Sequence, residues 1–380
     1  MMHTRKKILV FSDWFLPGYK AGGPIRSLAN LVHSLDIDFW IVTRITDHHS
    51  TQPYEGIQRG AWTQHRANVQ VCYVDQKDVT ALFVKKILRE HSFDYIYFNS
   101  LFSPIFTLLP LRTARAMGMA ERCVLAPRGM LKPGALSIKS KKKKIFLFVS
   151  RLLGWFNNIR WHATNEQEKQ EIKHHYGKSC MVFVAPNLAS IIDSNDEPVE
   201  KVSGSLKLVS IARISAEKGI REAIQFLKSA ELKTGVECVF FGTQQDEAYL
   251  NECKQLAAQI EGAHISFPGE IAPEEIPNAL QNAHFFYMAT WGENFGHAIA
   301  EALQHGKPVI ISDRTPWRIL KTANAGWDLP LEEKSFTEIL RVSHAMNQTE
   351  YNVWSHGAKS FGHAHANDPR HLQSYYSLFA

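Results

Sequence analysis

Short apolar runs recur along this 380-residue chain, and a segment of helix length separates each run from the next. The runs are continuously apolar rather than alternating, which is typical of strands in parallel sheets buried on both faces. The segments between them, for example 24–35, 220–232 and 247–260, have the apolar periodicity of helices. Strands are predicted at 7–11, 39–43, 69–74, 95–98, 122–125 and 181–184, and in a second series at 207–211, 236–241, 264–267, 285–288 and 308–311. We therefore predict an α/β chain with doubly wound parallel sheets.

The two series of strands are separated by a segment over 187–205 that is rich in Ser, Asp, Asn, Glu and Lys. This composition is typical of a linker, and 380 residues are many for one compact core. We predict one domain over 1–187 and a second over 206–365, followed by a helical tail over about 366–380. Because ligands bind at the carboxyl ends of parallel strands, the loops of both domains are expected to face one cleft.

The composition is that of an ordinary globular protein, with 45% apolar and 21% charged residues and a formal net charge of +6. No apolar run approaches the roughly 18 residues of a membrane-spanning helix. The first apolar run is too short for the core of a signal peptide. Five cysteines are scattered without metal-binding spacing, so we expect a reduced cytoplasmic protein and no structural metal.

A chemically informative segment follows the predicted strand 285–288. It contains Glu-Asn-Phe-Gly at 293–296, then a predicted helix over about 296–304 that ends at Gly306. A strand, a glycine-bearing turn and a helix start together present backbone N–H groups to an anion. The amides around Asn294, Phe295 and Gly296 are therefore candidates for binding a diphosphate.

Two glutamates flank the start of this helix. Glu301 lies among small and apolar residues, and a buried carboxylate needs hydrogen-bond donors such as the two hydroxyls of a ribose. Glu293, in the preceding loop, would instead lie over a sugar ring. The alternative is that Glu293 complements the helix dipole and that Glu301 is a surface residue. The spacing alone leaves both interpretations open.

Two cations follow the predicted strand 207–211. Arg213 and Lys218 come just before a helix, where paired positive charges can stabilise a leaving nucleoside diphosphate. Ordinary solvation of a loop is the alternative for either residue alone.

The stretch from Glu293 to Ile310, with its E-x7-E pair Glu293 and Glu301, resembles family 4 retaining glycosyltransferases of the GT-B fold. The resemblance implies two Rossmann-like domains facing a central cleft, with the helical tail packed on the first. It implies that Glu293 contacts the donor sugar, that Glu301 binds the nucleotide ribose, and that Arg213 and Lys218 form the R-x4-K phosphate clamp. It further implies a nucleoside-diphosphate sugar as substrate, UDP-sugar being favoured, with no additional cofactor.

Two smaller segments agree with this resemblance. Val-Ala-Pro-Asn at 184–187 is similar to the family's hinge, although Leu188 stands where a glycine is usual. Phe267 and Pro268 are candidates for the neighbourhood of the nucleotide base.

In the first domain, Gly22 and Gly23 precede Pro24 at a predicted helix start. Such glycines allow a backbone to approach a ligand closely, although most simply form turns. The loop lacks the G-x-G-x-x-G pattern, which argues against a dinucleotide-dependent enzyme. In the resembled family this loop approaches the donor phosphate.

The acceptor side is less well marked. Many family members carry a histidine after a strand near the reacting sugar, whereas this chain has Asn99 and Ser100 there, so no catalytic base is assigned. Both residues are candidates for positioning an acceptor. Ala-Pro-Arg-Gly-Met at 126–130 looks like the acceptor-side loop of bacterial polysaccharide members. Arg128 is therefore a candidate for binding a phosphate, or else a turn arginine in solvent.

A basic block, Lys139 and Lys141 to Lys144, precedes an apolar, aromatic-rich segment up to Trp155. This pattern over 139–155 indicates either attachment to an anionic membrane surface or a buried helix with a solvated basic start. The aromatic and basic interleaving of known nucleic-acid modules is missing, so no nucleic-acid partner is expected.

These observations predict a retaining hexosyltransferase with Glu293, Arg213 and Lys218 as its catalytic residues. It would transfer a sugar to a hydroxyl of a saccharide or lipid-linked acceptor in cell-surface polysaccharide or lipopolysaccharide synthesis, in the cytoplasm or peripherally on the inner face of the cytoplasmic membrane. One alternative is a GT-B epimerase or hydrolase of nucleotide sugars. The other is a non-catalytic membrane-surface protein, which would leave the segment 293–296 unexplained.

Overall fold

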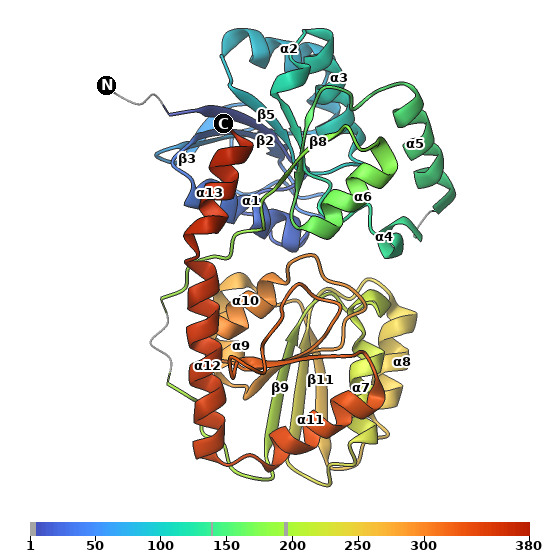
Figure 1. Cartoon of the computed structure of the whole chain (residues 1–380), viewed down its shortest axis with the longest axis vertical. Coiled ribbons are helices and arrows are strands. Elements are labelled where there is room, and N and C mark those ends of the chain that lie inside the picture. The colour runs from blue at the N-terminus through green and yellow to red at the C-terminus, as the bar shows by residue number, and fades with distance from the viewer. Residues whose placement is uncertain (1–4, 138–139, 194–196) are drawn as a thin grey trace. The chain divides into compact units, whose positions relative to one another are not determined.

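The computed structural model describes residues 5–137, 140–193 and 197–380 (Figure 1). The chain divides into two compact units. Unit 1 comprises the residues up to Leu188 together with Pro369–Ala380, and unit 2 comprises Ala189–Asp368. Each unit is built on a parallel sheet with helices around it, so the prediction of an α/β fold is confirmed.

Among the described residues, unit 1 contains an eight-stranded sheet in the order β3-β4-β2-β1-β5-β6-β7-β8. Neighbouring strands are parallel except at the β3–β4 edge, which is antiparallel. The strands are β1 (Lys7–Phe11), β2 (Asp38–Arg44), β3 (Trp62–Arg66), β4 (Val69–Val74), β5 (Tyr95–Phe98), β6 (Cys123–Leu125), β7 (Arg160–Ala163) and β8 (Met181–Val184). The α-helices are α1 (Gly23–Ser34), α2 (Ala81–Glu90), α3 (Leu109–Ala116), α4 (Pro133–Ser137), α5 (Ser140–Leu152) and α6 (Glu166–Tyr176).

Strand β1 shows why the predicted strands are continuously apolar. Leu9 and Phe11 belong to one cluster of buried side chains, whereas Ile8 and Val10 belong to a second cluster. Because successive side chains of a strand point to opposite faces, both faces of this sheet are buried. A strand in that position needs an apolar residue at every place.

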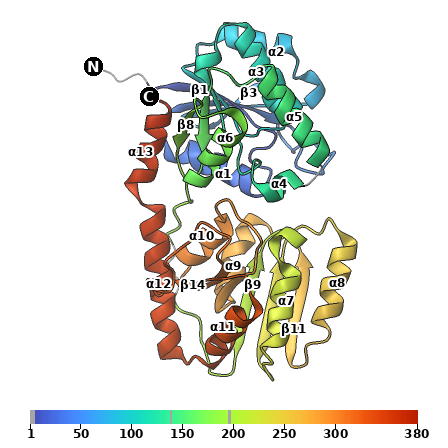
Figure 2. The same ribbon diagram turned by 45° about the vertical axis from the view of Figure 1, so that its right-hand side comes forward.

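Unit 2 contains, among the described residues, a fully parallel six-stranded sheet in the order β11-β10-β9-β12-β13-β14 (Figure 2). The strands are β9 (Leu206–Ile211), β10 (Val236–Phe241), β11 (Ala263–Gly269), β12 (Phe285–Met288), β13 (Val309–Ser312) and β14 (Gly326–Leu329). The helices are α7 (Ile220–Ser229), α8 (Glu247–Ala257), α9 (Ile276–Gln281), α10 (His297–Gln304), α11 (Glu333–Ala345) and α12 (Gln348–Ala366). Helix α7 packs against α8 and α11, and α10 packs against α12.

The order of the strands in unit 2 reverses between β9 and β12, which lie side by side. The chain moves from β9 toward β11 on one side and from β12 toward β14 on the other. In an open α/β sheet, the loops at such a switch point diverge and leave a crevice beyond the carboxyl ends of the two strands. Arg213 and Lys218 follow β9, and Glu293 follows β12.

Three strands escape prediction from the sequence: β3, β7 and β14. Strand β3 is an edge strand whose residues are mostly exposed, so these residues do not need to be apolar. Strand β7, Arg-Trp-His-Ala, contains two polar residues that have partners inside the unit. Strand β14 is only four residues long and contains a glycine and an aspartate, both of which disfavour strands.

The chain returns to unit 1 after α12, through helix α13 (Pro369–Leu378). Tyr375, Leu378 and Phe379 are buried in the core of unit 1. The ring of Phe379 lies 5.7 Å from that of Tyr95, and Arg160 donates to the carbonyl of Leu378 at 3.1 Å. Apolar burial and hydrogen bonds therefore both attach this terminal segment.

We expect Phe379→Ala to destabilise unit 1 by about 3–5 kcal/mol, because it leaves a cavity in a packed core. Tyr376→Ala is the matched control, since Tyr376 lies on α13 three residues before Phe379 with 40% of its surface exposed, and it should cost about 0.5 kcal/mol. Hydrogen exchange of unit 1 peptides across a urea series measures both effects. Equal effects of the two substitutions would contradict the described packing of α13.

Candidate functional site

The loops that follow β9 and β12 are joined by an ion pair. Lys218 Nζ lies 2.7 Å from Glu293 Oε2, although the two residues are 75 positions apart in the sequence. Their side chains are only 11% and 19% exposed. The structure thus brings together two of the residues that the sequence singled out for chemistry.

Glu293 is held in its charged form. Burial alone would raise the pKa of this carboxyl, but the Lys218 ammonium, the backbone N–H of Asn294 and the charge of His297 lower it below its ordinary value. The Asn294 amide donates to Glu293 Oε1 at 3.1 Å. Glu293 is therefore an anion with one oxygen toward Lys218 and the other toward the start of the 293–296 segment.

Arg213 lies on the same end of the sheet, nearer to solvent. Its guanidinium donates to Glu217 Oε2 at 3.1 Å, and both side chains are about half exposed. An exposed pair of this kind contributes little to stability. About half of the Arg213 side chain remains exposed to solvent.

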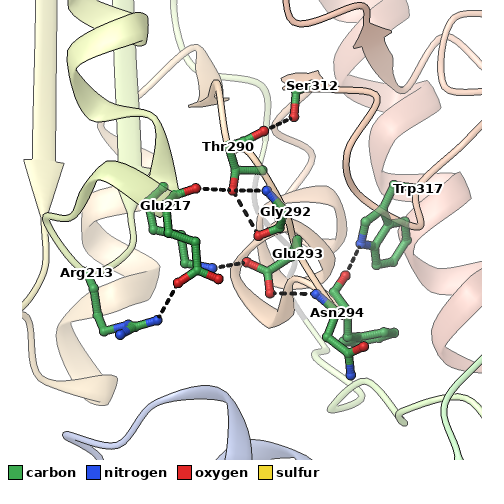
Figure 3. A network of polar contacts seen from close by, with 10 residues as sticks. Arg213, Glu217, Thr290, Gly292, Glu293, Asn294, Ser312 and Trp317 are labelled. Carbon is green, nitrogen blue, oxygen red and sulfur yellow. Dashed lines mark hydrogen bonds and ion pairs between the residues drawn. The ribbon is translucent and has the colours of Figure 1, made fainter. Parts of the chain in front are cut away.

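Hydrogen bonds from hydroxyl and backbone groups connect the loops around this pair, and Figure 3 shows those of Thr290 and Ser312. The Trp291 amide donates to the carbonyl of Glu217 at 3.0 Å, and the Thr290 hydroxyl lies 3.1 Å from the same oxygen. Ser312, at the end of β13, donates to the carbonyl of Thr290 at 2.5 Å. The loops after β9, β12 and β13 thus form one connected framework beneath Lys218 and Glu293.

Gly219 allows these loops to come close together. Its φ of 64° is left-handed, and a Cβ at this position would lie 1.7 Å from the carbonyl oxygen of Ala289. Any side chain would force the β9 loop away from the β12 loop. Gly219 therefore places Lys218, its immediate neighbour, within reach of Glu293.

Helix α10 begins beside Glu293. Its N-cap is Gly296, with φ 82°, and no side chain caps the helix there. The amides of a first helical turn have no acceptor within the helix, so they are suited to an anion. Phe295 is buried, and its carbonyl accepts from Trp317 Nε1 at 2.6 Å, which anchors the turn.

Glu301 lies in the second turn of α10 and is half-buried. The residues on either side of it, Ala300 and Ala302, are buried in the core. Glu301 therefore lies at the border between the core and the surface, and its predicted role toward a ribose remains a prediction.

The predicted neighbours of a nucleotide base lie at the end of β11. The ring of Phe267 stacks on that of Phe240 at 5.4 Å, and Pro268 is exposed. The amide of Gly242 donates to the carbonyl of Gly269 at 2.7 Å. Phe267 thus serves the packing of the unit, and Pro268 is the more accessible of the two.

In unit 1, the loop with Gly22 and Gly23 ends at the start of α1. Gly22 is the N-cap with φ 66°, and no heavy atom lies within 4 Å of where its Cβ would be. The positive φ is by itself a sufficient reason for a glycine at position 22. The open space above Gly22 and the exposure of Gly23 leave room for a ligand, whose identity remains a prediction.

Arg128 is enclosed by acceptors and is not a solvated turn arginine. Its guanidinium donates to Asn99 Oδ1 at 2.7 Å, to the Tyr97 hydroxyl at 2.8 Å and to Asn187 Oδ1. Burial opposes its charge, but Tyr97, Tyr375 and Glu168 raise its pKa above the ordinary value. Arg128, which the sequence predicts to bind a phosphate, thus links its own loop to β5 and to Asn187 near the end of the first segment of unit 1.

Asn99 and Ser100, the other acceptor-side candidates, lie at the end of β5 and are buried. The amide nitrogen of Asn99 donates to the carbonyl of Pro24 at 3.3 Å, and the Ser100 hydroxyl points to Met130 Sδ at 3.7 Å. Asn99 therefore contacts Arg128 through its side-chain oxygen and the start of α1 through its side-chain nitrogen.

His162 is a buried residue that the sequence did not single out. It lies 2.7 Å from the Tyr97 hydroxyl through Nδ1 and 2.8 Å from the Ala185 carbonyl through Nε2. Because the Ala185 carbonyl can only accept, Nε2 carries the proton, and Nδ1 of the neutral ring accepts from the Tyr97 hydroxyl. Burial and the charge of Arg128 lower the pKa of His162 to about 3, so it is neutral. No motif in the sequence marks this role.

A second feature missed by the sequence is a surface hollow of about 320 Å³ at the ends of β2 and β4, lined by Arg44, Thr46, Val74, Asp75, Gln76 and Lys77. Arg44 pairs with Asp13 at 2.9 Å and lies over the Trp14 ring. This hollow lies at the carboxyl ends of the parallel strands, where ligands of such sheets bind.

No group of three or more His, Cys, Asp or Glu residues suited to a metal ion occurs in the described parts of the chain. No helix among these residues is long and apolar enough to cross a bilayer.

Comparisons with known proteins agree with this geometry. The family model described as "Glycosyl transferases group 1" matches residues 192–324, which contain Arg213, Lys218, Glu293 and Glu301. This match supports a glycosyltransferase. No curated protein matches the chain.

Several solved structures are similar over nearly the whole chain. Alr3699/HepE of Anabaena, in complex with UDP and glucose, is 18% identical with a TM-score of 0.69, covering 98% of this chain and 99% of its own. Sucrose-phosphate synthase of Thermosynechococcus elongatus is 14% identical with a TM-score of 0.67, covering 99% and 98%. The trehalose-6-phosphate synthase OtsA is 10% identical with a TM-score of 0.70, covering 98% of each chain. At these identities the likeness concerns the fold, and the predicted GT-B fold is confirmed.

Gly219→Ala should destabilise unit 2 more than Gly204→Ala. Both glycines have a left-handed φ, but only at Gly219 would the new Cβ meet backbone atoms; at Gly204 no heavy atom lies within 4 Å. We expect about 1–2 kcal/mol at Gly204 from conformation alone, and a further 1–3 kcal/mol, roughly, at Gly219 from the overlap. Thermal unfolding measures both, and equal shifts would contradict the close approach of the two loops.

His162 should make unit 1 less stable as the pH falls. Its pKa in the folded state is about 3, below the ordinary 6.5, so only the unfolded chain gains this proton between these values. This residue should therefore reduce stability by up to about 1.36 kcal/mol for each pH unit below about 6.5. Urea unfolding at pH 7 and pH 5 measures the slope. His162→Gln should flatten it, with His174→Gln on the exposed face of α6 as the control; an unchanged slope would show that His162 is not buried as a neutral group.

Proposed function

We propose that this chain is a retaining glycosyltransferase that moves a hexosyl group from a nucleoside-diphosphate sugar to a hydroxyl. The observation that supports it most is the Lys218–Glu293 contact at the switch point of unit 2. This contact places a cation suited to a diphosphate beside a carboxylate suited to sugar hydroxyls. The family match over residues 192–324 supports the same class of enzyme.

The cations are proposed to bind the diphosphate. An ammonium carries three N–H donors, and Glu293 accepts from one donor of Lys218, so further donors can reach phosphate oxygens. Arg213, half exposed on the same end of the sheet, offers a guanidinium fork, and the first amides of α10, which follow Gly296, add neutral donors. Together they would stabilise the charge that develops on the leaving diphosphate.

The glutamates are proposed to orient the donor. Because the lowered pKa keeps Glu293 ionised, this carboxylate can accept hydrogen bonds from sugar hydroxyls while Lys218 fixes its position. Glu301, at the edge of the core on α10, would accept from the ribose hydroxyls. In the proposed reaction, the acceptor oxygen bonds to the anomeric carbon as the bond to the phosphate oxygen breaks. The acceptor proton passes to that leaving oxygen, so no protein base is required.

We propose a UDP-sugar as donor and a saccharide, lipid-linked in surface-polysaccharide synthesis, as acceptor. The similar structures of HepE are complexes with UDP and with UDP-glucose, which supports the choice of base. The acceptor class rests on the resemblance of residues 126–130 to a loop of polysaccharide enzymes. Gly22, Gly23, Asn99 and Ser100 remain predicted contributors from unit 1.

Lys218→Met should lower kcat for transfer by about 10²–10³-fold, as expected for losing one preorganised donor to a developing charge. Lys228→Met is the matched control, because Lys228 is an exposed cation on α7 in the same unit and contacts Gln259. It should leave kcat unchanged. The measurement is release of nucleoside diphosphate from radiolabelled UDP-sugar in the presence of a membrane lipid extract.

The same assay separates the proposal from its main rival. A transferase forms product only with the acceptor extract and retains the anomeric configuration, which NMR of the purified product shows. A nucleotide-sugar epimerase or hydrolase would convert the donor equally well without extract. That outcome, or full activity of Lys218→Met, would overturn the proposed function.

A further inference from the structure

Helix α5 of unit 1 has two apolar faces rather than one. Its inner face packs on the core: Leu147 is buried, and the ring of Phe146 lies 5.2 Å from that of Phe102 and 5.9 Å from that of Trp155. Ser150, also buried, lies 3.2 Å from the Tyr176 hydroxyl. These contacts attach the inner face of the helix to the core of unit 1.

The outer face carries large apolar side chains in contact with solvent. Ile145, Phe148 and Leu152 are 63%, 68% and 71% exposed, and Leu153 just after the helix is 61% exposed. Spacings of three, four and seven residues place the first three on one stripe of the helix. A contiguous apolar stripe on a solvent-exposed surface usually marks an interaction site.

Basic residues border this stripe. The exposed basic residues are Lys141, Lys142, Lys144 and Arg151. Lys144 lies four residues before Phe148 and Arg151 three residues after it, so both lie next to Phe148 on the helix surface. Lys143 is different, since its ammonium turns inward to the carbonyl of Ala135 and over the ring of Phe102. Lys139 lies outside the described residues. The sequence has no acidic residue between Glu121 and Glu166, so nothing in this stretch offsets the positive charge.

Helix α5 lies on the outside of unit 1 in both views (Figures 1 and 2). Its outer stripe is therefore presented by a single helix whose inner face is fixed to a folded core. Such a helix can lie in the plane of a bilayer interface, with its apolar side chains among acyl chains and its cations at the level of the headgroups.

We infer that α5 is a membrane-surface anchor that docks unit 1 on a bilayer containing anionic lipids. Ile145, Phe148, Leu152 and Leu153 insert at the boundary of headgroups and acyl chains, while Lys141, Lys142, Lys144 and Arg151 contact anionic headgroups. The combination of apolar and basic side chains favours this partner. A nucleic acid would neutralise the cations but leave four apolar side chains in water. An apolar protein groove would bury the stripe but leave the cations without counter-charges. This inference concerns unit 1 and does not depend on the proposed activity.

The test is sedimentation of the full-length protein with sucrose-loaded vesicles, made either of phosphatidylcholine alone or with one-third phosphatidylglycerol. The protein should bind the anionic vesicles, and 0.5 M KCl should weaken binding because it screens the charges. Phe148→Asp/Leu152→Asp and Lys142→Glu/Lys144→Glu should each lower the partition coefficient by at least about tenfold.

Helix α2 supplies matched controls. Leu82 is 78% exposed there, and Lys86 and Arg89 are exposed beside it. Leu82→Asp removes an equally exposed apolar side chain, and Lys86→Glu/Arg89→Glu changes the net charge by the same amount as the α5 pair. Neither should change vesicle binding by more than about twofold. Circular dichroism and nucleotide binding of all variants report whether unit folding and donor recognition are preserved.

Three results would overturn the inference. The first is absence of binding to anionic vesicles by a protein that still binds nucleotide, which would leave the proposed function standing. The second is equal loss of binding in the α2 and α5 variants, which would indicate nonspecific charge attraction. The third is a dimer, seen by analytical ultracentrifugation, that Phe148→Asp/Leu152→Asp dissociates, which would assign the stripe to a second copy of the chain.

Discussion

The ion pair between Lys218 and Glu293 organises the candidate site. Two charges with exposures of 11% and 19% lose much of their hydration, and a lone carboxylate in that place would be neutralised or displaced. The pair is tolerated because each member stabilises the charged form of the other, and the Asn294 amide adds a donor. The surrounding residues fix the geometry of the ion pair. Gly219 allows the two loops to come close together, and the Thr290 and Ser312 hydrogen bonds connect them. A ligand anion would therefore meet a cation that is already in position.

Unit 1 contains a partly buried cation with a different set of partners. The Arg128 guanidinium donates hydrogen bonds to Asn99, Tyr97 and Asn187. The hydrogen-bond network continues from Tyr97 to the neutral His162 and from there to the Ala185 carbonyl. This network joins β5, β7 and the segment by which the chain leaves unit 1. Three donors of Arg128 bind side chains of unit 1, whereas Lys218 pairs with the carboxylate of Glu293. The roles of Arg128 and Lys218 toward a phosphate remain predictions, and residue type alone did not reveal their different partners.

Much of the fold could be predicted because buried parallel strands require apolar residues on both faces. The strands without that requirement were missed: the exposed edge strand β3, the short β14, and β7 with its polar Arg160 and His162. The resemblance assigned both motifs of the site to one donor, but the contact between Lys218 and Glu293 depends on β9 lying beside β12, which no local pattern reveals. The enclosure of Arg128 depends likewise on residues from distant segments. For α5, the sequence left a buried helix and a surface helix as alternatives, and the structure shows one face packed on the core and apolar side chains exposed on the other.

The central claim is that the end of the unit 2 sheet binds a nucleoside diphosphate. Isothermal titration calorimetry of the full-length protein with UDP, GDP and ADP tests this directly, because it requires neither the acceptor nor the sugar. The account predicts one binding site per chain for one of these nucleotides, UDP being favoured, with clear preference over the corresponding nucleoside, which lacks the diphosphate that Lys218 and Arg213 would bind. Absence of binding by all three nucleotides, or equal affinity for the nucleoside, would contradict it.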